Sequence, residues 1–263
     1  MKMIDVDGAR LAYEDSGRTH GPAVLLVNAL GTDWGLWDEQ RTALEASFRV
    51  LRFDLRGHGK STLTDTATNP LWTIDTLVAD ACAVLDAVGV EHANWCGVSL
   101  GGMVAMRASI KRPQRVSRLV LANTAAQLGT PESWQVRSDA VLAGGMASLA
   151  EGVAARWFTP DFIVSHGERV ERILQMIRAT QPAAYAACCT AIRDMDQRAT
   201  LPFVQAPTLV IAGARDPGTT VEHAELLVAQ IPGADLLVLD ASHLSCVEQS
   251  EDFSVALLDF FRS

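Results

Sequence analysis

The pattern Gly97-Val98-Ser99-Leu100-Gly101 places a serine between two glycines with the spacing G-x-S-x-G. A short apolar run, residues 93–96, precedes it, and a helix-compatible stretch, residues 102–108, follows it. A serine on a sharp turn between a strand and a helix forms a nucleophile elbow, in which the hydroxyl stands clear of the strand end. Larger side chains at the flanking positions would collide with the strand or the helix, which explains the glycines. The context therefore predicts that Ser99 is a nucleophile.

A serine hydroxyl is a poor nucleophile near neutral pH, so it needs a base within hydrogen-bond reach and a carboxylate that orients the base. Asp216 follows the predicted strand of residues 208–212, and His243 follows the last predicted strand, residues 236–239. Loops that follow parallel strands meet at one edge of the sheet, the edge where Ser99 emerges. The chain order serine, aspartate, histidine is also the order of serine hydrolases with this elbow. We predict a Ser99–His243–Asp216 triad.

Other candidates for the acid and the base are weaker. Asp240 is a rival acid, but it lies only three residues before His243, and a carboxylate on a separate loop reaches the far ring nitrogen more easily. His58 lies in a glycine-laced turn, where we expect a structural role. His223 is expected to be exposed near the start of a helix.

The oxyanion that develops during acyl transfer needs two backbone N–H donors. Leu100 directly follows the nucleophile and should supply one of them. Leu30 lies in the loop Asn28-Ala29-Leu30-Gly31, which follows the predicted strand of residues 23–27, and should supply the other. That loop is also compatible with an ordinary turn.

The elements that must position these residues alternate between strands and helices. Apolar runs at residues 23–27, 118–122 and 208–212 are typical of strands buried on both faces. After Thr73, which is a plausible N-cap, apolar residues recur at helical spacing. The alternation predicts an α/β fold with a mostly parallel central sheet flanked by helices. Residues 126–198 have no buried-strand run, so we expect a single domain over 1–263 with a core of residues 1–125 and 199–263 and an inserted helical cap.

Composition narrows the class of protein. The chain has 263 residues, of which 49% are hydrophobic, and a net charge of −9 without a basic block. These values argue against nucleic acid and an anionic membrane surface as partners, and no apolar run reaches the roughly 20 residues of a membrane span. The amino terminus lacks the apolar core of a signal peptide. Five cysteines, an odd number without metal-ligand spacing, predict reduced thiols, a cytoplasmic protein and no metal site.

Several segments together resemble a known family. The elbow, the turn at residues 54–61 and the ordered triad look like the α/β-hydrolase superfamily. Within it, residues 28–32, 121–126, 134–137, 156–160 and 185–194 are similar to 3-oxoadipate enol-lactonases. Two positions depart from that pattern: Ala29 stands where serine is expected, and no proline follows Thr220.

The resemblance implies a cofactor-independent lactonase of aromatic-compound catabolism that opens 3-oxoadipate enol-lactone to 3-oxoadipate. Its partner would be a small lactone or ester. Alternatives on the same scaffold are a carboxylesterase, a C–C-bond hydrolase, or a ligand-sensing homologue with slow turnover. The sequence makes no prediction of the oligomeric state.

The implied substrate carries a free carboxylate, which needs a cation or several donors when it is buried. Arg137 is the first candidate, because its spacing from Trp134 puts both on one face of a helix. Trp134 would then form a wall of the pocket. Arg156, beside Trp157, is the second candidate. The alternative is that both arginines are solvated surface residues.

Overall fold

A central, mostly parallel sheet organises the molecule. The computed structural model describes residues 1–64 and 71–263, apart from the side chain of residue 151. Their strands form a nine-stranded sheet in the order β1-β2-β4-β3-β6-β7-β8-β9, with β5 paired to β2. The strands are β1 (Lys2–Val6), β2 (Ala9–Gly17), β3 (Ala23–Val27), β4 (Arg49–Phe53), β5 (Thr62–Leu63), β6 (Ala93–Val98), β7 (Val116–Ala122), β8 (Thr208–Gly213) and β9 (Asp235–Leu239).

The strands from β4 to β9 along this order are parallel, whereas β1 and β2 form an antiparallel hairpin that pairs with β4. The hairpin turns at Gly8, whose φ of 73° is readily adopted by glycine. Strands β3, β6 and β8 are buried along their whole length, as their continuous apolar runs predict. In β9 the apolar side chains of Leu236 and Val238 are exposed, because this strand forms the edge of the sheet. The predicted fold class is confirmed.

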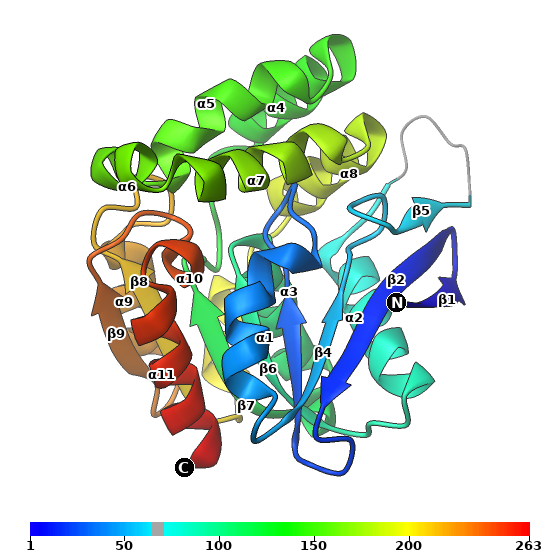
Figure 1. Ribbon diagram of the computed structural model, residues 1–263, viewed down its shortest axis with the longest axis vertical. Coiled ribbons are helices and arrows are strands. Elements are labelled where there is room, and N and C mark those ends of the chain that lie inside the picture. Colours follow the sequence, from blue (N-terminus) through cyan, green and yellow to red (C-terminus); the bar gives the residue numbers. More distant parts are fainter. Residues whose placement is uncertain (65–70) are drawn as a thin grey trace.

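Helices cover both faces of the sheet (Figure 1). One face carries α1 (Asp38–Leu44) and α11 (Ser250–Arg262), and the other carries α2 (Ile74–Ala87), α3 (Leu100–Lys111) and α9 (Val221–Gln230). Helix α2 begins at the predicted N-cap: Thr73 and Thr76 form a capping box. Short helical segments complete these layers, namely η1 (Trp34–Trp37), η2 (Pro113–Arg115), η3 (Arg198–Phe203) and α10 (Ser245–Glu248).

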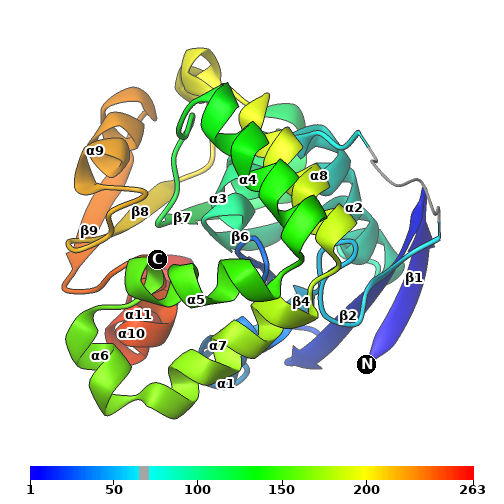
Figure 2. The same cartoon turned by 90° about the horizontal axis from the view of Figure 1, so that it is seen from above.

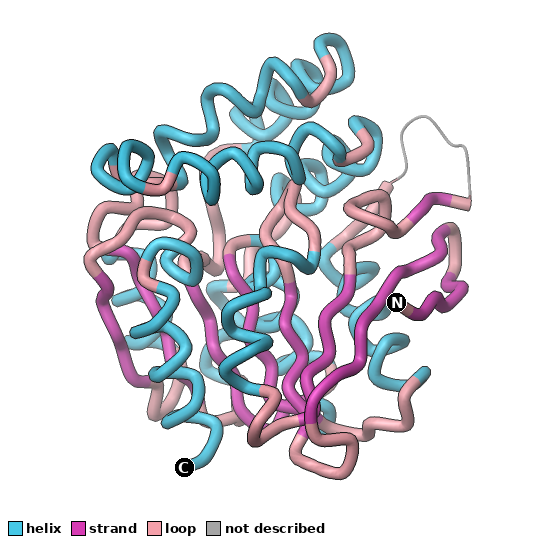
Figure 3. Tube along the Cα trace, in the orientation of Figure 1, coloured by secondary structure: helices cyan, strands magenta, loops and turns pink. Residues whose placement is uncertain are grey.

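A further group of helices lies across the carboxyl edge of the sheet, above the loops that follow the strands (Figures 2 and 3). These helices are α4 (Pro131–Gly144), α5 (Ala147–Trp157), α6 (Pro160–Ser165), α7 (Gly167–Ala179) and α8 (Pro182–Arg193). Helix α7 is tied to the layer below by an ion pair between Arg172 and Asp38. The N–H of Gln181 donates to the carbonyl of Gly57 at 3.1 Å, which joins the start of α8 to the turn after β4.

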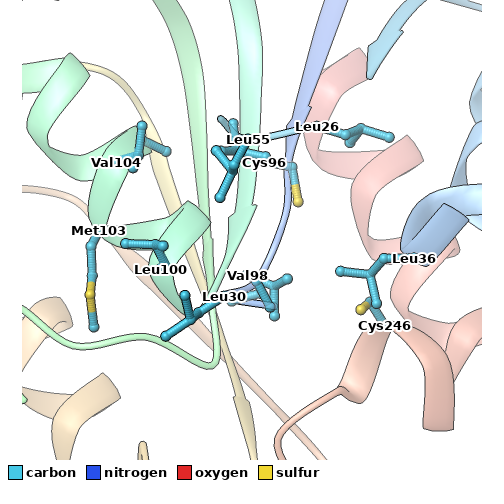
Figure 4. Close-up of a cluster of buried hydrophobic side chains, with 14 of the residues drawn as sticks. Leu26, Leu30, Leu36, Leu55, Cys96, Val98, Leu100, Met103, Val104 and Cys246 are labelled. Carbon is cyan, nitrogen blue, oxygen red and sulfur yellow. The ribbon is translucent and has the colours of Figure 1, made fainter. Parts of the chain in front are cut away.

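The core surrounds the strand that ends at the elbow. Figure 4 shows part of it, where side chains of β3, β6 and α3 pack together, among them Leu26, Cys96 and Val104. All five cysteines are buried free thiols. Within residues 1–64 and 71–263, no helix combines the length and the apolar character needed to cross a bilayer.

Candidate active site

Ser99 lies on a strained turn between β6 and α3. Its φ of 57° and ψ of −119° are rare for a residue with a side chain. Close packing explains the flanking glycines: a Cβ on Gly97 would lie 2.1 Å from the carbonyl oxygen of Gly101, and a Cβ on Gly101 would lie 2.1 Å from that of Val27. The elbow can therefore form only because both positions lack side chains.

The loops after β8 and β9 bring the acid and the base to the serine. Nε2 of His243 lies 2.9 Å from Oγ of Ser99, so the hydroxyl can donate to it. Nδ1 of His243 lies 2.7 Å from Oδ2 of Asp216. Both distances suit proton transfer from the serine to an imidazole that a carboxylate orients.

Asp216 is held ionised in a buried position. Burial alone would raise its pKa, but the charge of His243 and hydrogen bonds from His243, Thr219 and Gly218 outweigh burial and lower the pKa to about 2. The N–H groups of Gly218 and Thr219 donate to Oδ1 at 2.9 and 3.1 Å, and the Thr219 hydroxyl donates to Oδ2 at 2.5 Å. This carboxylate can therefore stabilise an imidazolium without taking its proton.

The competing residues lie elsewhere. Asp240 forms a bidentate ion pair with Arg215 at 2.6 and 2.8 Å on the surface. His58 is fully buried beside the turn, its Nδ1 lies 3.0 Å from the carbonyl of Arg56, and burial lowers its pKa to about 4. The expectation for His223 was wrong: it is half-buried and lines the cavity described below, because the start of α9 lies next to the Asp216 loop.

Leu100 and Leu30, the two residues predicted to supply oxyanion donors, lie directly after the serine and in the lining of its cavity. Leu100 is the first residue of α3, where N–H groups have no partner within the helix, and Leu30 lines the cavity together with Ser99. Among the hydrogen bonds of the described residues, none uses either N–H. The loop of Leu30 is fixed from both sides: Nδ2 of Asn28 donates to the carbonyl of Phe53 at 2.9 Å, and the Thr32 hydroxyl donates to that of Ala29 at 2.9 Å.

A cavity of about 850 Å³ opens above Ser99 and His243. Its floor is the edge of the sheet, and its walls come largely from α4 and α5, with Ile192 from α8. Apolar side chains dominate the lining, among them Met103, Leu128, Val141, Leu149 and Ile192. All four residues expected to bind substrate also line it: Trp134, Arg137, Arg156 and Trp157. The Trp157 ring lies 5.8 Å from the ring of His243, centroid to centroid.

The guanidinium of Arg137 is fixed by aromatic neighbours. It lies 5.4 Å from the ring centroids of both Trp134 and Tyr185. Nε donates to the Tyr185 hydroxyl at 2.8 Å, and Nη2 donates to the same oxygen. Burial raises the pKa of Tyr185, so this phenol stays neutral.

Arg156 contributes a second positive charge to the cavity wall. Burial, together with the neighbouring charge of Arg137, lowers its pKa. Within the described part of the chain, neither guanidinium forms an ion pair with a carboxylate. Two neighbouring cations that pair with no described carboxylate favour an anionic ligand.

Sequence reasoning missed three residues that hold the site together: Thr219 and Asn123, which donate to Asp216, and Tyr185, which holds Arg137. A signal existed for Asn123, since a polar residue directly after a buried strand lies at the edge where ligands bind. Tyr185 gave no such signal, because nothing in the spacing of α4 and α8 shows that they pack together.

Comparisons with known proteins agree with this geometry. The family model described as alpha/beta hydrolase fold matches residues 22–250. The chain is 38% identical to 3-oxoadipate enol-lactonase 2 of Acinetobacter baylyi, over 94% of this chain and 91% of that protein. It is 35% identical to 3-oxoadipate enol-lactonase 1 of the same organism, over 97% and 94%. The crystal structure of the enol-lactonase from Burkholderia xenovorans LB400 superimposes with a TM-score of 0.95 at 36% identity and covers 100% of both chains. The chain therefore belongs to the 3-oxoadipate enol-lactonase family of the α/β-hydrolase superfamily.

Proposed function

We propose that this protein is a 3-oxoadipate enol-lactonase, a serine hydrolase that opens the lactone ring to 3-oxoadipate in aromatic-compound catabolism. The observation that carries the proposal is the hydrogen-bonded series Asp216–His243–Ser99 at the floor of a cavity whose wall holds two guanidiniums that pair with no carboxylate of the described residues. The printed names of the relatives support the same substrate.

Ring opening begins with attack of Ser99 Oγ on the lactone carbonyl carbon. Nε2 of His243 accepts the hydroxyl proton, and the Asp216 carboxylate stabilises the resulting imidazolium through Nδ1–H. The carbonyl oxygen becomes an oxyanion, to which the N–H groups of Leu30 and Leu100 donate. The position of Leu100 at the start of α3 and of Leu30 in the cavity lining supports this assignment.

Collapse of the tetrahedral intermediate breaks the bond between the carbonyl carbon and the ring oxygen. The leaving group is an enol oxygen, a better leaving group than an alkoxide, and it stays tethered within the acyl-enzyme. It takes the proton from His243. Neutral His243 then accepts a proton from water, whose oxygen attacks the ester carbonyl. The bond between Ser99 Oγ and the carbonyl carbon then breaks, Oγ takes the proton back from His243, and the second carboxyl group of the product forms. The enol becomes the ketone when a proton moves from oxygen to carbon.

We infer that residues 126–198 act as a cap on a core of residues 1–125 and 199–263, and that the cap binds the carboxylate of the substrate. Arg137 is the main ligand in this proposal, with Trp134 as the wall beside it. Arg156 adds a second charge, and Trp157 packs on the side of the catalytic histidine. A free carboxylate on the substrate balances the positive charge of the two guanidiniums.

Hydrolysis of simple carboxylic esters is the second candidate. A volume of about 850 Å³ exceeds the needs of a six-carbon lactone and lies toward the upper end of ordinary ligand pockets, roughly 300–1,000 Å³. The test is a comparison of kcat/KM for the enol-lactone, a saturated lactone with the same carboxylate, and p-nitrophenyl acetate. The proposal requires the enol-lactone to be preferred by at least about 100-fold, which corresponds to roughly 2.7 kcal/mol of transition-state stabilisation. A preference for the neutral ester would favour the second candidate.

We also propose a cytoplasmic location and catalysis without a cofactor. The five free thiols support the first proposal, because thiols remain reduced in that compartment. The second follows from the mechanism, in which protein groups and water perform every proton transfer.

A further inference from the structure

Asn123 follows β7, the strand between those that lead to the nucleophile and the acid. β7 pairs on one side with β6, which ends at the elbow, and on the other with β8, which precedes the Asp216 loop. The residue after β7 therefore lies at the sheet edge between Ser99 and Asp216. Asn123 is buried there, with 2% of its surface exposed.

The carboxamide of Asn123 joins the loop of the acid to the loop of the base. Nδ2 donates to Oδ2 of Asp216 and to the carbonyl of Ser242, the residue before His243, each at 3.2 Å. The Ser245 hydroxyl donates to Oδ1 at 2.5 Å. Both amide hydrogens and the amide oxygen thus have partners, and Ser245 determines which end of the amide faces the acid.

The backbone of Asn123 is held in an uncommon conformation. Within the described residues, only Ser99 and Asn123 combine a side chain with a positive φ, which is 43° at Asn123. Its N–H donates to the carbonyl of Ile211 in β8 at 2.8 Å, and the hydroxyl of the next residue, Thr124, donates to the carbonyl of Ser99 at 2.7 Å. Such a conformation persists where its surroundings fix it. Residues 123 and 124 therefore contact the acid loop, the base loop and the nucleophile.

We propose that Asn123 is a positioning residue of the triad, which acts through Asp216 by holding Oδ2 against Nδ1 of His243. The inference rests on the proposed hydrolysis by Ser99. Oδ2 accepts from three donors: His243 at 2.7 Å, the Thr219 hydroxyl at 2.5 Å and Asn123 at 3.2 Å. The amide and the threonine fix the orientation of the carboxylate, and the bond to Ser242 fixes the start of the base loop. Without the amide, Oδ2 loses one of the donors that orient it toward the imidazole, and the base loop loses its link to the acid.

Asn123→Gly tests this role, because glycine accepts the positive φ and the change removes the side chain that carries the carboxamide. We would measure kcat and KM on p-nitrophenyl acetate in the parent enzyme and in Asp216→Asn. In the parent, kcat should fall roughly 10- to 100-fold, the effect of losing one hydrogen bond to a charged group, and KM should change less than about twofold. In Asp216→Asn, the same change should lower kcat by less than about threefold, because the carboxylate through which Asn123 acts is gone.

Ser245→Ala repeats the test without altering position 123. If Asn123→Gly does not fold, the loss of kcat in Ser245→Ala is compared between the parent and Asp216→Asn in the same way. Ser245→Ala should lower kcat several-fold in the parent and leave Asp216→Asn unchanged. Asn94→Ala, which removes a buried asparagine of β6 outside the cavity, is the matched control and should retain parent-like kcat.

Equal losses in both backgrounds, a loss confined to KM, or parent-like kcat in Asn123→Gly would overturn the role of Asn123. Failure of the proposed function can be distinguished from failure of this role for Asn123, since it would appear as ester turnover without lactone turnover in the parent enzyme.

Discussion

Arg137→Met should separate recognition of the substrate from the chemistry. Methionine keeps an apolar stem beside Trp134 but removes the guanidinium. In the parent, Nε and Nη2 donate to the Tyr185 hydroxyl, so that edge is occupied and the remaining N–H groups of the two terminal nitrogens are available to a carboxylate. The variant should therefore bind the carboxylated lactone poorly and a neutral ester normally.

The magnitude follows from the surroundings of Arg137. Truncating one partner of a buried, hydrogen-bonded charge pair costs about 2–5 kcal/mol. Arg137 is half-buried, and Arg156 still supplies positive charge to the cavity. We therefore expect a loss of about 2–3 kcal/mol, or roughly 30- to 150-fold in kcat/KM for the enol-lactone. Most of it should appear in KM, because a carboxylate remote from the reacting bond is bound equally in the ground state and the transition state.

The assay compares kcat/KM for the enol-lactone and p-nitrophenyl acetate in matched variants. Arg198→Met removes an exposed arginine that pairs with Asp196 outside the cavity, and it should affect neither substrate. Tyr185→Phe keeps the aromatic ring but removes the hydroxyl that orients Arg137, so it should lower lactone turnover by a smaller factor, roughly 3- to 10-fold. Equal losses on both substrates in Arg137→Met would show that Arg137 does not bind the carboxylate and instead supports the folding of the cap.

Three further predictions concern the chemistry itself. Asp216→Asn should lower kcat by roughly 10⁴, because the imidazole loses the partner that fixes its tautomer. Asp240→Asn removes only a surface ion pair with Arg215 and should lower kcat much less. The reverse ranking of the two folded variants would exchange the roles of the two aspartates. The pKa of Asp216, which burial alone would raise, is lowered to about 2 by His243 and the hydrogen bonds it accepts. It therefore stays ionised above about pH 4, and NMR of its carboxyl carbon should show no titration between pH 4 and pH 8; a titration step in that range would contradict the lowered pKa. Extensive chelation should leave kcat unchanged, because protein groups and water perform every step, and loss of activity that zinc or manganese restores would contradict this.

Local rules predicted much of the architecture. The continuous apolar runs of β3 and β8 and the N-cap at Thr73 depend on neighbours in sequence, and the structure has them where expected. The glycines at 97 and 101 were predictable because an elbow leaves no room for a Cβ, and the distances of 2.1 Å agree.

Contacts between segments that are distant in the sequence were harder to predict. Tyr185 reaches Arg137 across 48 positions, and only the packing of α4 on α8 brings them together. His223 was expected on the surface, but the start of α9 follows the Asp216 loop closely, and His223 lines the cavity. The exposed face of β9 was also not predictable, because an apolar run does not show whether a strand lies at the edge of its sheet.

In the proposed function, repeated turnover of the enol-lactone depends on Ser99. The direct measurement follows conversion of 3-oxoadipate enol-lactone with the product identified by NMR, using the parent enzyme and Ser99→Ala freed of any parent protein. We expect many turnovers per molecule of parent enzyme and a loss on the order of 10⁶ in kcat for a folded Ser99→Ala. A parent that binds the lactone without turning it over, or a variant that retains activity within about tenfold of the parent, would contradict it.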